Sequence, residues 1–148
     1  MVGVVSDLLP NIYIDRLQEI LDDTSRSFNW YWNSSTASDT QQKSLDNNFM
    51  FTHLLFHQET NTRSSYLETF FPIIYFLNPN IMAEKVYRMK LNLYPNQGKK
   101  ITHAKHIDIT NKDTSKPLKD CKITVFNFTT CNGGTIINDK EYSSNANE

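Results

Sequence analysis

The chain has 148 residues, which is enough for one domain with a real buried core and too few for two ordinary domains. Its 15 Lys and Arg residues against 16 Asp and Glu give a formal net charge of −1, so the basic excess that nucleic acid requires is lacking. The longest apolar run, 70–77, is interrupted by Pro72 and falls far short of the ~20 residues that span a membrane. We therefore expect neither nucleic acid nor a membrane as the partner.

The N-terminal decapeptide, MVGVVSDLLP, lacks the basic start and long apolar segment of a secretory signal. We therefore expect a cytoplasmic protein whose only two cysteines, Cys121 and Cys131, stay reduced.

The first third of the chain predicts a helix, a short strand and a long polar loop. Apolar residues recur at helical spacing between Leu8 and Asp23, which predicts an amphipathic helix. The aromatic stretch FNWYW, 28–32, is typical of a short strand, in which Trp30 and Trp32 share one face. Core packing is the more common use of such a pair, with substrate stacking as the alternative. The polar loop from Asn33 to about Asp46 is the best candidate for a flap or an insertion.

The middle of the chain predicts two strands separated by a helix. Residues 48–58 have the bulk and length of a buried strand, and Ser65 to Glu68 matches a capping box that starts a helix, which Pro72 should kink or restart. Residues 85–95 alternate cleanly, which predicts a strand with two distinct faces. One face consists of Tyr87, Met89, Leu91 and Leu93, and the other of Arg88, Lys90, Asn92 and Tyr94.

After Pro95 the helical period disappears and short segments are separated by turn residues at 96–98 and 132–134. The expected strands lie around 106–109, 121–128, 135–137 and 141–144. Helices followed by strands predict an α+β fold with a double-sheet barrel. We expect a single domain over 1–148, in which 1–85 supports the barrel with two flanking helices and 86–148 forms the first part of its core.

The sequence HAKHIDITN carries the strongest chemical signal. In a strand, His106 and Asp108 would point to the same side, because side chains at i and i+2 share a face. An imidazole and a carboxylate that converge in this way supply two ligands of the two-His, one-carboxylate triad, which leaves open positions on Fe(II). The bare pattern is common by chance, so the surrounding sequence has to decide.

Three ordered blocks surround this pattern: LLPNIYIDRLQEIL with FNWYW, then RMKLNLYPNQGKKITHAKHIDI, then KITVFNFTTCNGGTIINDKEYSSNANE. Together they resemble the Fe(II)/2-oxoglutarate-dependent dioxygenases, in the prolyl-4-hydroxylase-like branch with phage and marine bacterial members. The first block is similar to the family's N-terminal helix and first strand, and the second to its metal-proximal strand and first two ligands. The third is similar to a later strand and a Gly-Gly-Thr hairpin.

The resemblance implies a jelly-roll (double-stranded β-helix) enzyme that uses Fe(II), 2-oxoglutarate and O₂ to hydroxylate a peptidyl or small-molecule substrate in a bacterial or phage-infected cell. It implies that His106 and Asp108 are iron ligands and that Tyr94 hydrogen-bonds 2-oxoglutarate. Asn127 stands where members often carry a tyrosine near the co-substrate.

Two family features do not occur in the sequence. No histidine follows Asp108, so the family's third iron ligand is missing. The Arg or Lys that follows this third ligand in the family, and pairs with 2-oxoglutarate, is missing as well. We therefore expect a truncated form of the enzyme, with the alternative of a non-catalytic jelly-roll binding or structural module.

Other side chains offer weaker alternatives. His53 and His57, four apart and expected on one face of a strand, are better interpreted as hydrogen-bonded rings than as ligands, and His103 as a loop residue. Three further interpretations remain open. His106 and Asp108 could form a surface hydrogen bond or bind zinc, and Arg88 and Lys90 could recognise a carboxylate.

Overall fold

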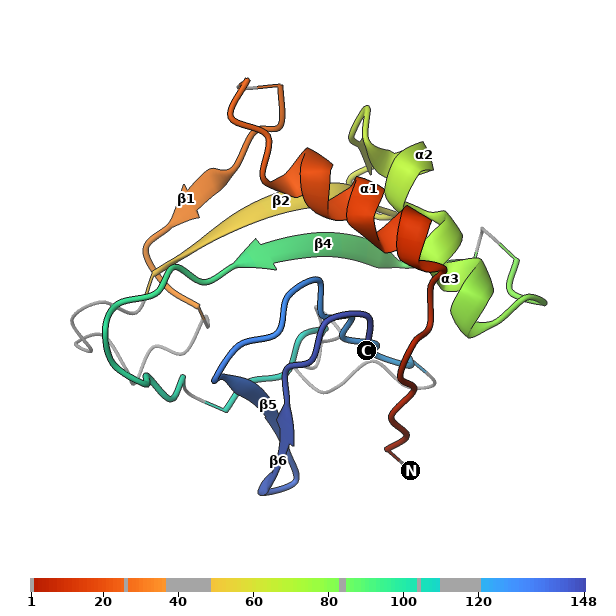
Figure 1. The fold of residues 1–148 in the computed structure, drawn as a ribbon. Helices are drawn as coiled ribbons and strands as arrows, with labels where there is room; N and C mark the ends of the chain where they lie inside the picture. The colour runs from red at the N-terminus through yellow and green to blue at the C-terminus, as the bar shows by residue number, and fades with distance from the viewer. Residues whose placement is uncertain (1, 26, 37–48, 83–84, 104, 110–120) are drawn as a thin grey trace.

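The computed structural model describes residues 2–25, 27–36, 49–82, 85–103, 105–109 and 121–148. It has an α+β architecture, as expected, with three helices, a four-stranded antiparallel sheet and a separate two-stranded hairpin in this part of the chain (Figure 1). The described strands do not close into a barrel, so the jelly-roll is not seen. Most of the predicted polar loop, 37–46, lies outside the described residues.

Strand β2 (Met50–His57) is the centre of the larger sheet, and its length agrees with the predicted buried strand. Strand β4 (Arg88–Leu93) pairs along almost all of β2. The short strands β1 (Tyr31–Asn33) and β3 (Thr62–Arg63) pair with the two ends of β2. Since β4 occupies one edge of β2, β1 and β3 share the other edge. The strand expected over 28–32 is β1, which begins three residues later than expected, at Tyr31.

A β-bulge interrupts the pairing of β2 with β4 at Leu55. His53 lies opposite Leu91, whereas His57 lies opposite Arg88. Leu91 and Arg88 are three residues apart on β4, so they belong to opposite faces of the sheet. The prediction that His53 and His57 share a face is wrong, because the extra residue in the bulge reverses the alternation.

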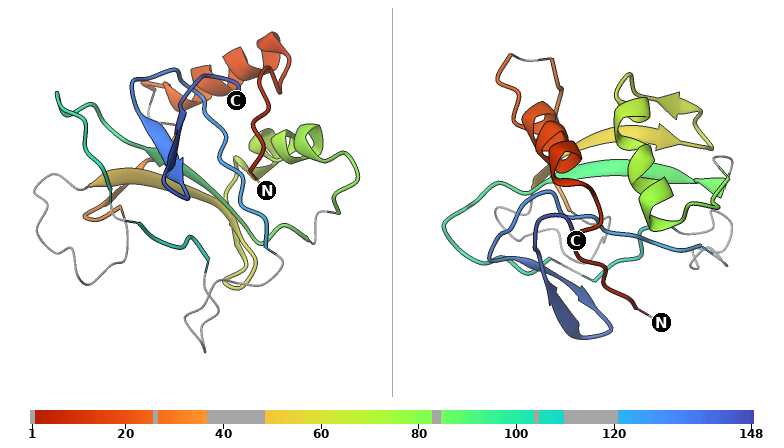
Figure 2. Two further views of the ribbon diagram at one scale, coloured as in Figure 1. Left: turned by 90° about the horizontal axis from the view of Figure 1, so that it is seen from below. Right: turned by 45° about the vertical axis from the view of Figure 1, so that its right-hand side comes forward.

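The helices lie on one side of this sheet, and the main core forms between them and the strands (Figure 2). Helix α1 (Asn11–Leu21) buries Ile14 and Leu17, as its periodicity predicted. The longest described helix is α1, with eleven residues, and no described helix is long and apolar enough to cross a membrane. The buried members of the core are Leu9, Ile14, Leu17, Phe28, Leu55, Leu67, Phe70, Ile73 and Leu91.

Pro72 divides the second helical region into α2 (Leu67–Phe70) and α3 (Pro72–Leu77), which confirms the predicted restart. The capping box expected at Ser65 is wrong, because no side chain caps α2. Instead the Ser64 hydroxyl accepts the Tyr66 N–H at 3.1 Å, just before the helix.

His53 is a buried, hydrogen-bonded ring, as predicted. Its Nδ1 lies 2.7 Å from the Asn29 carbonyl oxygen and its Nε2 lies 2.7 Å from the Ser64 hydroxyl. The ring also stacks on Phe28, with 4.4 Å between centroids. Both nitrogens are therefore used within the core, and His53 is not available as a metal ligand.

Strands β5 (Gly134–Ile137) and β6 (Lys140–Ser143) form the hairpin. Its turn is made by Asn138 and Asp139, at φ 50° and 65°, the left-handed geometry of a type I′ turn. The strands expected over 106–109 and 121–128 are wrong, because neither segment pairs with a strand within the described residues. Phe126 and Phe128 nevertheless pack against the main core.

Asn147 connects the two ends of the described chain. Its side chain accepts the Leu9 N–H and donates to the Leu9 carbonyl, each at 2.8 Å, and its own carbonyl accepts the Leu8 N–H at 3.2 Å. The residue is 6% exposed and has φ 63°, a conformation that asparagine tolerates better than most residues. These bonds attach the segment before α1 to the C-terminal end of the described chain. The helix begins at Asn11 rather than Leu8 because Pro10, its N-cap, disfavours the helical conformation in the residue before it.

We expect Asn147→Ala to lower the free energy of unfolding by about 3 kcal/mol, because it leaves two buried backbone groups of Leu9 without partners. Urea denaturation followed by circular dichroism measures the loss. Asn145→Ala is the matched control, since Asn145 is exposed and its side chain donates to the Glu148 carboxylate at the surface, and it should stay within about 0.5 kcal/mol of the parent. Equal losses in the two variants would contradict the role given to Asn147.

We expect Gly134→Ala to disrupt the β5–β6 hairpin, because a Cβ there would lie 2.5 Å from the Tyr142 carbonyl oxygen. Amide hydrogen exchange at Thr135 and Ile137, which occupy the hydrogen-bonded positions of the hairpin, should accelerate. Gly133→Ala is the control, since its Cβ would meet only the Cys131 sulfur at 3.4 Å. Unchanged protection in Gly134→Ala would show that the strands tolerate the extra atom.

Candidate metal centre

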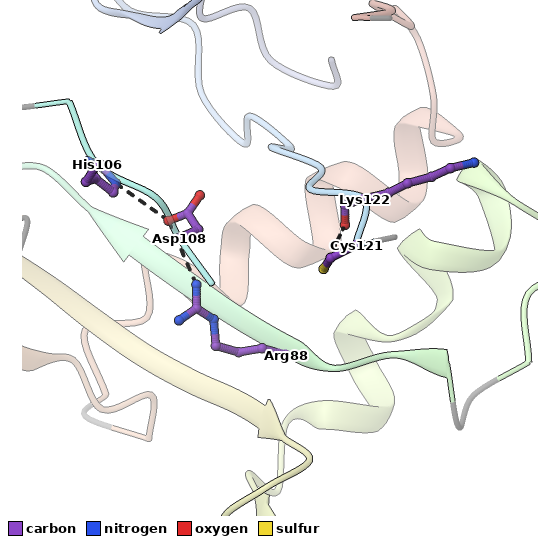
Figure 3. Close-up of polar contacts among 5 residues, drawn as sticks. All are labelled: Arg88, His106, Asp108, Cys121 and Lys122. Carbon is purple, nitrogen blue, oxygen red and sulfur yellow. Dashed lines mark hydrogen bonds and ion pairs between the residues drawn. The ribbon is translucent and has the colours of Figure 1, made fainter. Parts of the chain in front are cut away.

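The carboxylate of Asp108 is the centre of a three-residue polar cluster (Figure 3). Its Oδ1 lies 3.5 Å from Nε2 of His106 and 3.8 Å from Nη2 of Arg88. The exposed fractions are 38% for the Asp108 side chain, 40% for His106 and 24% for Arg88. The cluster is therefore accessible from solvent, while Arg88 forms its more buried side.

Alternation along β4 places the cluster on the face of the sheet away from the helices. Leu91 faces the core, so Arg88 and Lys90 belong to the other face. The segment 105–109 lies on that same side, as the left view of Figure 2 shows. His106 and Asp108 are thus brought together by an irregular segment packed beside β4, and not by a strand of their own.

The distance between the two side chains is compatible with a shared metal ion. Two ligand atoms about 2.1 Å from one ion, at right angles to each other, lie about 3 Å apart. The observed 3.5 Å between Nε2 of His106 and Oδ1 of Asp108 is close to this value. The described residues contain no group of three His, Cys, Asp or Glu side chains suited to a metal.

Asp108 also influences its neighbours on and after β4. Desolvation raises the pKa of Tyr94, and the negative charge of Asp108 raises it further, so the phenol stays protonated. Desolvation lowers the pKa of Lys90, the positive charge of Arg88 lowers it further, and Asp108 partly offsets both effects. Tyr94 therefore lies in the same electrostatic environment as the pair, as its predicted role requires.

His103 lies at the margin of the cluster. Its ring packs beside Tyr94, with 5.3 Å between centroids, and its Nδ1 lies 3.0 Å from the Thr36 hydroxyl. Desolvation lowers the pKa of His103, and the positive form of His106 lowers it further. The expectation of a loop residue agrees with the structure, since no strand or helix includes His103.

Asn127 belongs to a different part of the molecule. Its N–H donates to the Glu148 carbonyl at 2.9 Å, and its carbonyl accepts the Asn147 N–H at 2.8 Å. No contact described in the structure joins Asn127 to His106 or Asp108. The structure thus brings Tyr94, His106 and Asp108 into one neighbourhood and shows a main-chain role for Asn127.

Arg88 is the member of the cluster to which the sequence analysis gave no role. The signal that could have found it is the alternation of 85–95, which put Arg88 and Tyr94 on the same face of one strand. The sequence alone did not reveal that Asp108 would lie beside that face.

No family model matches this chain, and neither a curated protein nor a solved structure matches it.

We expect the pKa of His103 to lie below its ordinary value of 6.5. The unfolded chain then binds a proton at His103 more readily than the folded chain does, so folding stability should decrease as the pH falls below about 6.5. NMR titration of the ring protons measures the pKa, and His106→Gln should raise it by removing the neighbouring positive charge. A His103 pKa above 6.5, or one unmoved by His106→Gln, would contradict this account.

Proposed function

We propose that this chain carries part of the iron centre of an Fe(II)/2-oxoglutarate-dependent oxygenase of the jelly-roll class, which hydroxylates a peptidyl or small-molecule substrate. His106 and Asp108 are two of the protein ligands. The observation that carries the proposal is the 3.5 Å separation of Nε2 and Oδ1 in an accessible cluster. The resemblance of the surrounding sequence blocks supports it, with 86–148 as the first part of the jelly-roll.

The protein's own residues would bind and orient in this centre. Arg88, on β4, would attract the Asp108 carboxylate electrostatically across 3.8 Å. Tyr94, protonated over the physiological range, has a hydroxyl that is able to donate to an oxygen of 2-oxoglutarate. When bound, iron, 2-oxoglutarate and O₂ would supply the oxidising chemistry that inserts a hydroxyl group into a C–H bond.

His106 and Asp108 would be two of the three protein ligands of such a centre. The third protein ligand, a second histidine in the facial triad, does not come from the described residues. We therefore expect these 148 residues to bind a divalent ion weakly, and turnover to require a further ligand.

A second candidate is the non-catalytic binding or structural module. The Arg88–Asp108 ion pair favours it, because a guanidinium 3.8 Å away already partly balances the carboxylate charge without a metal. Surface ion pairs contribute about 0 to 1 kcal/mol, so this pairing does not prevent a metal from taking the carboxylate. The two candidates differ in one measurable property, which is metal binding at His106 and Asp108.

The test is a titration of the chain with Co(II), a spectroscopic substitute for Fe(II), followed by visible absorption and by NMR line broadening. We expect saturable binding, with the signals of His106 and Asp108 broadened first. His106→Ala and Asp108→Asn should each weaken the binding at least tenfold. Succinate formation from 2-oxoglutarate, in the presence of Fe(II), is then measured for the parent and for His106→Ala.

Asp139→Asn is the matched control for Asp108→Asn. Asp139 also pairs with a basic residue of the 105–109 segment, Lys105, but its side chain is 79% exposed. Its Co(II) affinity should equal that of the parent. Co(II) binding that survives both His106→Ala and Asp108→Asn, or no saturable binding at all, would favour the non-catalytic module.

A further inference from the structure

The polar face of β4 presents two basic side chains side by side. Arg88 and Lys90 are two residues apart on one strand, so their side chains leave the sheet on the same side, with Cα atoms about 7 Å apart. Both residues are partly buried, whereas a solvated face would expose them. This arrangement differs from the usual outcome for charges that alternate along a strand.

Lys90 has no partner within the described residues. No hydrogen bond or ion pair of its ammonium group is seen there, and its cross-strand neighbour on β2 is the apolar Leu54. Arg88 has only the 3.8 Å contact with Asp108, which is longer than a hydrogen bond. Among the residues that the structure describes, two partly buried cations thus share one carboxylate, so the positive charges outnumber the negative ones there by one.

The surroundings make this charge imbalance unfavourable. Arg88 and Asp108 are the charged groups that influence Lys90, and the effect of Arg88 together with desolvation lowers the Lys90 pKa. A bound anion would reverse both contributions, because it would neutralise the excess charge and replace lost hydration with hydrogen bonds.

We propose that Arg88 and Lys90 form a binding site for a small oxyanion, of the carboxylate or phosphate type. Arg88 contributes a planar guanidinium that matches two oxygens of such a group, and Lys90 contributes a point charge with three donors. The accessible imidazole of His106 lies beside Arg88, through Asp108, and offers a further donor at the edge of the site. This inference does not require iron, so it goes beyond the proposed oxygenase.

The test uses the whole chain, stripped of metal with EDTA and dialysed into a buffer of low ionic strength. Inorganic phosphate, succinate and 2-oxoglutarate are titrated separately, and amide shifts are followed by NMR, with sodium chloride at matched ionic strength as the blank. We expect saturable shifts confined to 88–94 and 105–109. Lys90→Met should raise the Kd at least tenfold, and Lys90→Arg should keep it within about threefold of the parent.

Lys105→Met is the matched control, because Lys105 lies in the same neighbourhood but is 80% exposed. Its Kd should stay within twofold of the parent. Tighter binding of succinate and 2-oxoglutarate than of phosphate would assign a carboxylate ligand, and the reverse order would assign a phosphorylated one. Shifts that do not saturate, or equal affinities in the parent and Lys90→Met, would overturn the proposal. Because metal is absent throughout, failure here is distinct from failure of the Co(II) titration.

Discussion

The pairing of β2 with β4 determines where the functional groups of this protein lie. Leu91 and Met89 on one face of β4 join the core beneath the helices, and this fixes Arg88 and Lys90 on the other face. A one-residue shift of β4 would exchange the two sets, bury both cations and expose the core leucine. The main core and the polar cluster are therefore two consequences of one register.

The parts of the fold that sequence reasoning found are those determined by local pattern. Helix α1 and strand β4 have clear periods, and the restart at Pro72 follows from the missing N–H of proline. The bulge at Leu55 has no such signal, because it depends on how β2 and β4 align across the sheet. The role of Asn147 could not be predicted from local pattern either, since its hydrogen-bond partner Leu9 is 138 residues away in the chain.

The sequence analysis named residues of the candidate site, but it did not predict the backbone structure that holds them. His106 and Asp108 do approach each other, but in an irregular segment, so the i, i+2 argument from strand geometry does not explain their proximity. The alternation of polar and apolar residues wrongly predicted a strand over 106–109. Ile107, the apolar residue between His106 and Asp108, is 50% exposed, so burial of its side chain does not hold this segment in a sheet. Arg88 could be placed on a face of β4, whereas its contact with Asp108 required the path of the chain after Tyr94.

The two proposed ligands of this face are energetically linked through Asp108. A divalent ion on His106 and Asp108 would draw the carboxylate from Arg88, and the lost ion pair would cost only about 1 kcal/mol at this exposure. Arg88 and Lys90 would then hold two charges with no carboxylate between them, which strengthens their attraction for an oxyanion. By reciprocity, an anion on Arg88 and Lys90 would release Asp108 for the metal, so each ligand should increase the affinity of the other by the same factor. Such coupling is expected of a centre in which a metal ion and an anionic co-substrate bind side by side, and a purely structural ion-pair cluster has no reason to show it.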